Sequence, residues 1–278
     1  MENQKLYKID SNGNTRVWWM EYDKKKYRTH SGIEGGKIVV SGWQYPEAKN
    51  VGRANETTVA EQVVAEVEAK YTEKQYQGKY HANKKHTTKG AQYIECMLAD
   101  KYDAKKHVNF PYYTQPKLDG VRCLVSKDGM QSRNGKPIIS APHIREQLEP
   151  FFQEYPNIVL DGELYNHDLK NDFEKIISLA RKTKPTAADL KESEKMIQYH
   201  VYDMIDEKGD WTFLDRFDLI ADELINEYPS IHVVKITIAD NEEEIMENLS
   251  WYLEQGYEGQ MLRVGKSFYE GKRSKNLI

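Results

Sequence analysis

From residue 121 onward, short apolar runs rich in β-branched residues alternate with amphipathic stretches, and this alternation limits the possible folds. Five runs of strand length occupy residues 121–126, 158–161, 198–204, 233–239 and 260–264. The stretches between them carry apolar residues at helical spacing, and three of these stretches stop before Pro185, Pro229 and Gly256. Because helices and strands both recur along the chain, we expect an α+β domain here.

The first 80 residues have a different pattern, in which short strand-like segments are separated by turns. Turn residues stand at positions 12–14 (Asn-Gly-Asn) and 35–36 (Gly-Gly). A helix follows: Thr58 and Glu61 form a capping-box pattern, and an apolar residue recurs every fourth position from Val59 to Tyr71. We therefore expect a separate small α+β domain over residues 1–80.

Residues 81–91 contain almost no apolar side chain, but they include Lys84, Lys85 and Lys89. A polar segment of this kind cannot bury much surface and is typical of a flexible connection. The expected organisation is therefore a domain over 1–80, a linker over 81–91 and a second domain over 92–278.

The charged residues are unevenly distributed along the chain. The formal net charge is −4, yet residues 81–117 hold seven Lys/Arg against three Asp/Glu, whereas residues 240–260 hold seven acidic and no basic residues. A basic surface for nucleic acid is compatible with this total, and plain solvated faces are the alternative. No apolar run approaches the roughly 20 residues of a bilayer helix, so we expect a soluble cytoplasmic protein without membrane contact.

Charged residues and glycines gather at four places where apolar runs begin or end. These places are Lys117-Leu118-Asp119-Gly120-Val121-Arg122, Ser132-Arg133-Asn134-Gly135, Asp161-Gly162-Glu163 and Glu258-Gly259. No glycine-rich phosphate loop is present in the sequence. Any nucleotide site would therefore depend on side chains more than on a helix N-terminus.

The order and spacing of these four motifs resemble the covalent nucleotidyltransferases, which comprise DNA ligases, RNA ligases and mRNA-capping guanylyltransferases. The segment His200-Val201-Tyr202-Asp203 resembles the strand that carries a base-stacking aromatic residue. Gln115-Pro116 before the lysine, together with Met97-Leu98-Ala99, is most similar to ATP-dependent DNA ligases of the bacteriophage type. The resemblance covers about residues 92–278. It implies an adenylation domain of mainly antiparallel sheets flanked by helices.

The resemblance implies a reaction of three phosphoryl transfers. The amine of Lys117 takes AMP from ATP, the AMP passes to the 5′-phosphate of a nick, and the 3′-hydroxyl then seals the nick and releases AMP. Positioning and neutralisation of charge carry most of the catalysis in such steps. The implied cofactors are ATP and Mg²⁺, and the implied partner is nicked double-stranded DNA.

The resemblance also assigns roles to individual residues. Glu163 and Glu258 are expected to bind Mg²⁺, since hard cations favour carboxylate oxygens, and Glu163 is also expected near the ribose. Arg122 and Arg133 are expected to contact ribose and phosphate, and Arg133 is expected to hold the 5′-phosphate of the nick in a later step. Tyr202 is expected to stack on adenine, with Phe213 as the second candidate. Gln115 is expected to contact the adenine edge. Asp161 is expected to be structural.

The first 80 residues resemble a WGR domain, which is a DNA-end-binding module. The similarity lies in Trp18-Trp19, Ser41-Gly42-Trp43 and the glycine-rich segment 31–37, although the Trp-Gly-Arg triplet itself is absent. The resemblance implies DNA contacts from Arg16, Arg28, Lys37 and Arg53. A scaffold or protein-binding role is the alternative.

In the family, a lysine pair and an oligonucleotide-binding domain follow the segment that ends here at Ile278. We therefore expect a truncated, monomeric piece of a ligase, found in the host cytoplasm if it is phage-encoded. The alternatives are an RNA ligase, a capping-type guanylyltransferase, or a DNA-binding module with an inactive nucleotidyltransferase domain. The presence of Lys117, Glu163 and Glu258 argues against the inactive alternative.

Overall fold

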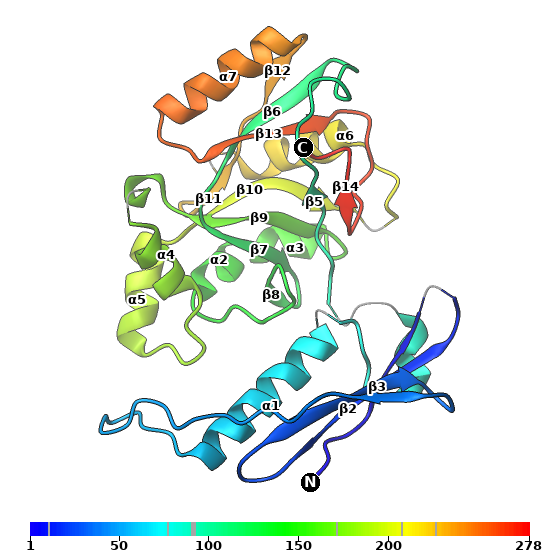
Figure 1. Cartoon of the computed structure of the whole chain (residues 1–278). Coiled ribbons are helices and arrows are strands. Elements are labelled where there is room, and N and C mark those ends of the chain that lie inside the picture. Colours follow the sequence, from blue (N-terminus) through cyan, green and yellow to red (C-terminus); the bar gives the residue numbers. More distant parts are fainter. Residues whose placement is uncertain (11, 77, 90–92, 171, 207, 226) are drawn as a thin grey trace. The chain divides into compact units, whose positions relative to one another are not determined.

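The computed structural model describes residues 1–278 except residues 11, 77, 90–92, 171, 207 and 226, and it divides the chain into two compact units. The first unit is Met1–Tyr93 and the second is Ile94–Ile278. Both units contain helices and strands (Figure 1). No helix within these described residues combines the length and the apolar character needed to span a bilayer.

The first unit contains a four-stranded antiparallel sheet. β1 (Leu6–Ile9), β2 (Thr15–Tyr22), β3 (Tyr27–Ile33) and β4 (Ile38–Val40) pair in chain order. The turns expected at residues 12–14 and 35–36 join β1 to β2 and β3 to β4. Gly13 and Gly35 have φ angles of 80° and 77°, which side chains other than glycine rarely adopt.

One helix, α1 (Val59–Tyr76), packs against this sheet and begins at the expected capping box. The Glu61 carboxylate accepts hydrogen bonds of 2.8 Å from the backbone N–H and from the hydroxyl of Thr58. In return, the Glu61 N–H donates to the Thr58 hydroxyl oxygen at 3.3 Å. Alternate residues of β2 pack with α1 in a core formed by Leu6, Trp18, Met20, Tyr27, Val63, Val67 and Tyr80.

Much of the segment expected to be a linker belongs to the first unit. His81 pairs with Tyr7 of β1 through two backbone hydrogen bonds of 2.8 and 2.9 Å. A 3-10 helix, η1 (Lys84–Lys89), follows directly. Residues 90 and 91 lie outside the described residues. A low content of apolar side chains therefore did not prevent this segment from pairing through its backbone.

The second unit is built around a five-stranded sheet. Its spatial order is β11 (Ile231–Val233), β10 (Gln198–Ile205), β9 (Val159–Tyr165), β7 (Val121–Ser126) and β8 (Gly129–Ser132). All neighbours are antiparallel except β10 and β11. The large apolar core combines strand residues with residues of α2 (Pro142–Gln147), α3 (Glu149–Glu154), α4 (Phe173–Ala180) and α6 (Phe213–Leu224), and α5 (Ala187–Met196) packs on α4.

A three-stranded antiparallel sheet lies beside the five-stranded sheet (Figure 1). It consists of β12 (Thr237–Ala239), β6 (Tyr112–Lys117) and β13 (Gly259–Val264), and it packs against α7 (Glu242–Glu254). Two further strands, β5 (Leu98–Ala99) and β14 (Arg273–Ser274), form a short parallel pair. A short 3-10 helix, η2 (His167–Leu169), follows β9.

The prediction of a single strand over residues 233–239 is wrong. β11 ends at Val233 in the five-stranded sheet, and β12 begins at Thr237 in the three-stranded sheet. Between them, the Val234 N–H donates to the Val201 carbonyl at 2.8 Å, and the Val234 carbonyl accepts from the Gln115 side chain at 3.0 Å. Apolar periodicity reports a half-buried extended segment, but it does not report a change of pairing partner within that segment.

The other expected elements of this unit are present. The remaining four apolar runs form β7, β9, β10 and β13, and the stretches before Pro185, Pro229 and Gly256 contain α4, α6 and α7. Among the described residues, the structure adds three α-helices, α2, α3 and α5, that the sequence analysis did not identify.

Candidate active site

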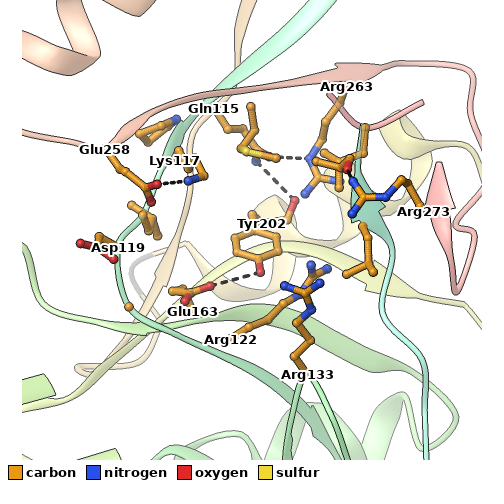
Figure 2. A pocket seen from close by; sticks show the side chains of 17 residues that line it. Gln115, Lys117, Asp119, Arg122, Arg133, Glu163, Tyr202, Glu258, Arg263 and Arg273 are labelled. Atoms are coloured by element: carbon orange, nitrogen blue, oxygen red, sulfur yellow. Dashed lines mark hydrogen bonds and ion pairs between the residues drawn. The ribbon is translucent and has the colours of Figure 1, made fainter. Parts of the chain in front are cut away.

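Residues from both larger sheets line a cavity of about 390 Å³. β6 and β13 supply one wall, β7, β9 and β10 supply another, and β5 and β14 contribute at the edge. Figure 2 shows the charged side chains of these strands pointing toward a common space. The cavity therefore gathers residues that are up to 179 positions apart in the chain, from Leu98 to Leu277.

Lys117 lies at the end of β6 and contacts Glu258, which precedes β13. In the ladder between these strands Lys117 is opposite Gly259, and the Glu258 N–H donates to the Lys117 carbonyl at 3.1 Å. The amine of Lys117 forms an ion pair with Oε1 of Glu258. The two side chains are 43% and 44% exposed, so a ligand in the cavity can reach the amine.

Two glycines of the motifs allow strands to approach closely beneath the cavity. A Cβ atom on Gly120 would lie 2.4 Å from the Leu164 carbonyl oxygen and 2.7 Å from Cγ of Glu163. A Cβ atom on Gly162 would lie 2.5 Å from the His200 carbonyl oxygen. Any larger residue would push these strands apart. Glycine therefore fixes how closely the Lys117 turn can approach β9.

Glu163 projects from β9 into the cavity beside Tyr202 of β10. The Tyr202 hydroxyl donates to Oε2 of Glu163 at 3.4 Å (Figure 2). Burial, the largest influence, raises the pKa of Glu163 to about 8, although the Arg122 guanidinium opposes this shift. A carboxyl group with this pKa is mostly protonated at neutral pH until a positive charge approaches it.

The Arg122 guanidinium is held mainly by Asp161. Its Nε and Nη2 atoms donate to the two carboxylate oxygens at 2.9 and 2.5 Å. Asp161 is fully buried, and it also accepts a 2.6 Å hydrogen bond from the Tyr269 hydroxyl. Because its bidentate face is occupied, Arg122 has fewer donors for a ligand than its position in the motif suggested.

Arg133 and Arg273 provide exposed positive charge at the cavity. Arg133 lies in the turn after β8, where the Gly135 N–H donates to the Ser132 carbonyl at 2.8 Å. Among the described residues, no ion pair involves Arg133, and Figure 2 shows it beside Arg122. Arg273 donates from Nη1 to the Ala99 carbonyl, and within the described part of the chain its side chain has no further hydrogen bond or ion pair. Both guanidinium groups can therefore bind an anion.

Gln115 lies deeper in the cavity wall and is only 1% exposed. Its amide nitrogen donates to the carbonyls of Tyr202 and Val234 at 3.3 and 3.0 Å. Its amide oxygen accepts a 2.6 Å hydrogen bond from Nε of Arg263. The side chain is thus held in one orientation by protein groups.

A comparison with protein families agrees with this arrangement. The family model described as ATP dependent DNA ligase domain matches residues 96–278, which is well over half of the chain. The chain belongs to the ATP-dependent DNA ligase family.

Individual ligases are similar to this chain at low sequence identity. The DNA ligase of Enterobacteria phage T6 is 24% identical over 229 residues, which cover 65% of this chain and 47% of that ligase. The Chlorella virus DNA ligase-adenylate has a TM-score of 0.52 at 21% identity, with 66% of this chain and 65% of that chain covered. The bacteriophage T7 ligase in complex with ATP has a TM-score of 0.50 at 16% identity, with 66% and 67% covered. The chain spans about half the length of the phage T6 ligase, and the solved structures show the shared fold.

In this ligase domain, one cavity brings together all but one of the nucleotide- and metal-binding candidates of the second unit. They are Gln115, Lys117, Arg122, Arg133, Glu163, Tyr202 and Glu258. The prediction of Phe213 as the second residue that could stack on adenine is wrong. Phe213 is 1% exposed and packs beneath Arg263, whose guanidinium lies 4.9 Å from its ring, so no base can stack on it.

Three charged residues of the cavity had no role in the sequence analysis. Asp119 lies within the lysine motif, Arg263 lies within the apolar strand β13, and Arg273 lies in β14. An arginine within an apolar strand was a signal for Arg263, because such a residue is rarely buried without a partner. Arg273 gave no comparable signal.

The four cations expected to bind DNA in the first unit do not form one cluster. In the β2–β3 ladder, Arg16 shares a face with Trp18, whereas Arg28 lies on the opposite face beside Glu21. Arg28 is paired with Glu21 at 2.6 Å. Lys37 and Arg53 are exposed in loops. One flat binding surface cannot include both Arg16 and Arg28.

Proposed function

We propose that this chain is the adenylation part of an ATP-dependent DNA ligase and that Lys117 becomes covalently linked to AMP. The observation that carries this proposal is the exposed amine of Lys117, which lies in a cavity lined by Glu163, Glu258, Tyr202 and Arg133. A nucleophile, acidic residues, an aromatic ring and free cations are the groups that nucleotidyl transfer from a triphosphate requires.

In the first step, Nζ of Lys117 attacks the α-phosphorus of ATP. A P–N bond forms, the bond from the α-phosphorus to the bridging oxygen breaks, and pyrophosphate leaves with that electron pair. Attack requires the neutral amine, so the ion pair between Lys117 and Glu258 has to separate and the ammonium has to lose a proton. Tyr202 stacks on the adenine ring, and Gln115 faces its edge.

The later steps use the same residues. The 5′-phosphate of a nick attacks the phosphorus of lysyl-AMP and releases the Lys117 amine, and the 3′-hydroxyl then attacks the 5′-phosphate and expels AMP. Arg133 holds the 5′-phosphate, because its guanidinium has no ion pair among the described residues and can form a charge-assisted fork.

The acidic residues of the cavity are suited to Mg²⁺. Among the described residues, no three His, Cys, Asp or Glu side chains form a metal-binding group. Mg²⁺ commonly binds one or two carboxylates and completes its shell with water and substrate phosphates, so Glu163 and Glu258 would be sufficient. A bound Mg²⁺ would supply neutralisation of the phosphate charge. The high pKa of Glu163 fits a carboxyl that ionises when a cation arrives.

For the first unit, we propose a WGR-like module that binds the DNA duplex, with contacts from Arg28 or from Arg16 but not from both through one surface. Lys37 and Arg53 would add exposed contacts. We further propose a monomer that acts in the cytoplasm, which would be that of the host for a phage-encoded protein.

Transfer of a label tests the proposed reaction. The chain is incubated with Mg²⁺ and with ATP labelled at the α-phosphate, and the labelled protein is then mixed with duplexes that contain a DNA nick or an RNA nick. We expect the label to appear on the protein and to move to the 5′-phosphate of the DNA nick. Movement to the RNA nick alone would favour an RNA ligase, and labelling by GTP instead of ATP would favour a guanylyltransferase.

A further inference from the structure

The side chain of Gln115 has only one orientation that its neighbours accept. Arginine has donors and no acceptor, whereas backbone carbonyls only accept. Arg263 therefore selects the amide oxygen, and the carbonyls of Tyr202 and Val234 select the amide nitrogen. A flipped amide would set N–H against N–H and oxygen against two oxygens, so the network decides the orientation.

Arg263 is itself fixed by a buried network. Its Nη1 donates to Oδ2 of Asp203 at 2.5 Å, and Asp203 also accepts from Nε and Nη2 of Arg216 at 2.7 and 3.1 Å. Asp203 and Arg216 are fully buried, and Arg263 is 4% exposed. Arg216 also donates to the carbonyls of Trp211 and Ser267 at 2.8 and 3.2 Å. The amide of Gln115 is thus the end of a chain of hydrogen bonds with no freedom to reverse.

This orientation determines what Gln115 can offer a ligand. Both hydrogens of its amide nitrogen are used by the two carbonyls, whereas its amide oxygen has a second lone pair after binding Arg263. Toward the cavity, Gln115 can accept a hydrogen bond but cannot donate one. Gln115 and Tyr202 line the same cavity, so a base stacked on the Tyr202 ring, as proposed above, can turn its edge toward Gln115.

We propose that Arg263 is a positioning residue that sets nucleotide specificity by holding Gln115 as an acceptor. A 6-aminopurine donates a hydrogen bond to Gln115, whereas a 6-oxopurine brings an oxygen against an oxygen. This inference rests on the proposed function, because it concerns the nucleotide that modifies Lys117. Leaving a buried polar group without its partner lowers a rate by about 10- to 100-fold.

A nucleotide series tests the specificity in the unsubstituted chain. The rate of covalent modification is measured by intact mass with ATP, with inosine triphosphate and with purine riboside triphosphate, which has hydrogen at position 6. We expect ATP to react fastest, the unsubstituted purine to be slower and inosine triphosphate to be slowest. Equal rates for ATP and inosine triphosphate would overturn the proposal.

The role of Arg263 is tested by Arg263→Lys, with Arg273→Lys as the matched control. Lysine has no counterpart of the Arg263 Nε donor, so an ammonium group that stays with Asp203 leaves only the two carbonyls to hold the Gln115 amide, and the preference for the acceptor orientation weakens. We expect the ratio of the ATP rate to the inosine triphosphate rate to fall at least about fivefold. In Arg273→Lys both rates change together, because Arg273 does not contact Gln115.

The outcomes separate this inference from the proposed function. If ATP gives no adduct with the unsubstituted chain, the proposed function is wrong. If ATP gives an adduct and Arg263→Lys keeps the original ratio, only the role of Arg263 is wrong. Thermal unfolding of Arg263→Lys shows whether the variant is folded, and if it is not, the nucleotide series with the unsubstituted chain decides.

Discussion

Replacement of Arg216 by methionine should destabilise the second unit strongly. Methionine fills similar space, but it removes both hydrogen bonds from Arg216 to Asp203 and leaves the Trp211 and Ser267 carbonyls without this donor. Loss of one partner from a buried ion pair costs about 3–5 kcal/mol. Because Asp203 keeps its hydrogen bond from Arg263, we expect the lower end, about 3 kcal/mol.

Calorimetry of the whole chain measures this effect. For a unit of this size, about 3 kcal/mol corresponds to a fall in Tm of about 6–12 °C. The matched control is Lys106→Met, which removes an exposed ion pair of 3.2 Å and should cost less than about 1 kcal/mol. A loss below about 1 kcal/mol in Arg216→Met would refute the reasoning, because it would mean that the buried network contributes no more than a surface pair.

Three further predictions concern the site and its surroundings. Gly120→Ala should slow the modification of Lys117 by about 10- to 100-fold, since a shift of about 1 Å is enough for such a loss. The control Gly259→Ala should change the rate little, because its Cβ would have no neighbour within 4 Å. Similar losses in both variants would contradict the steric argument. Burial, the largest influence, lowers the pKa of His200 from 6.5 to about 3, so the unfolded chain binds the proton more readily and stability falls as the pH drops below about 6.5. Between pH 7.5 and pH 5 this residue should cost about 2 kcal/mol in urea unfolding, and a His200→Gln variant with the same pH dependence as the original would exclude His200 as the cause. Glu163→Ala should slow adduct formation far more than it weakens binding of nicked DNA, measured by fluorescence anisotropy, because metal contacts strengthen as charge develops; equal losses would count against the metal role.

Periodicity and turn chemistry were sufficient to predict most of the elements that form the site. The apolar runs around Val121, Ile158 and Gln260 became strands in which consecutive residues are buried, and Gly13 and Gly35 marked hairpin turns. The same signal did not separate β11 from β12, because pairing partners depend on residues far away in the chain. The helices α2 and α3 also escaped, since six residues give too few repeats of an apolar face, and α5 escaped because most of its ten residues are polar or charged.

The motifs predicted which residues meet, but they did not predict what those residues bind within the protein. Arg122 was expected to face ribose and phosphate, yet its bidentate face is occupied by Asp161. Gln115 was expected to read a base, yet its amide oxygen already accepts a hydrogen bond from Arg263. Both outcomes depend on contacts between strands that are 39 and 148 positions apart, and spacing within one motif contains no information about such contacts.

The central claim is that Lys117 carries AMP, and peptide mapping after reaction with ATP and Mg²⁺ tests it most directly. The account predicts one AMP group on the peptide that contains Lys117, its loss in Lys117→Ala and its persistence in the control Lys106→Ala. GTP and NAD⁺ should give no adduct. An AMP group on another residue, or an undiminished adduct in Lys117→Ala, would contradict the account.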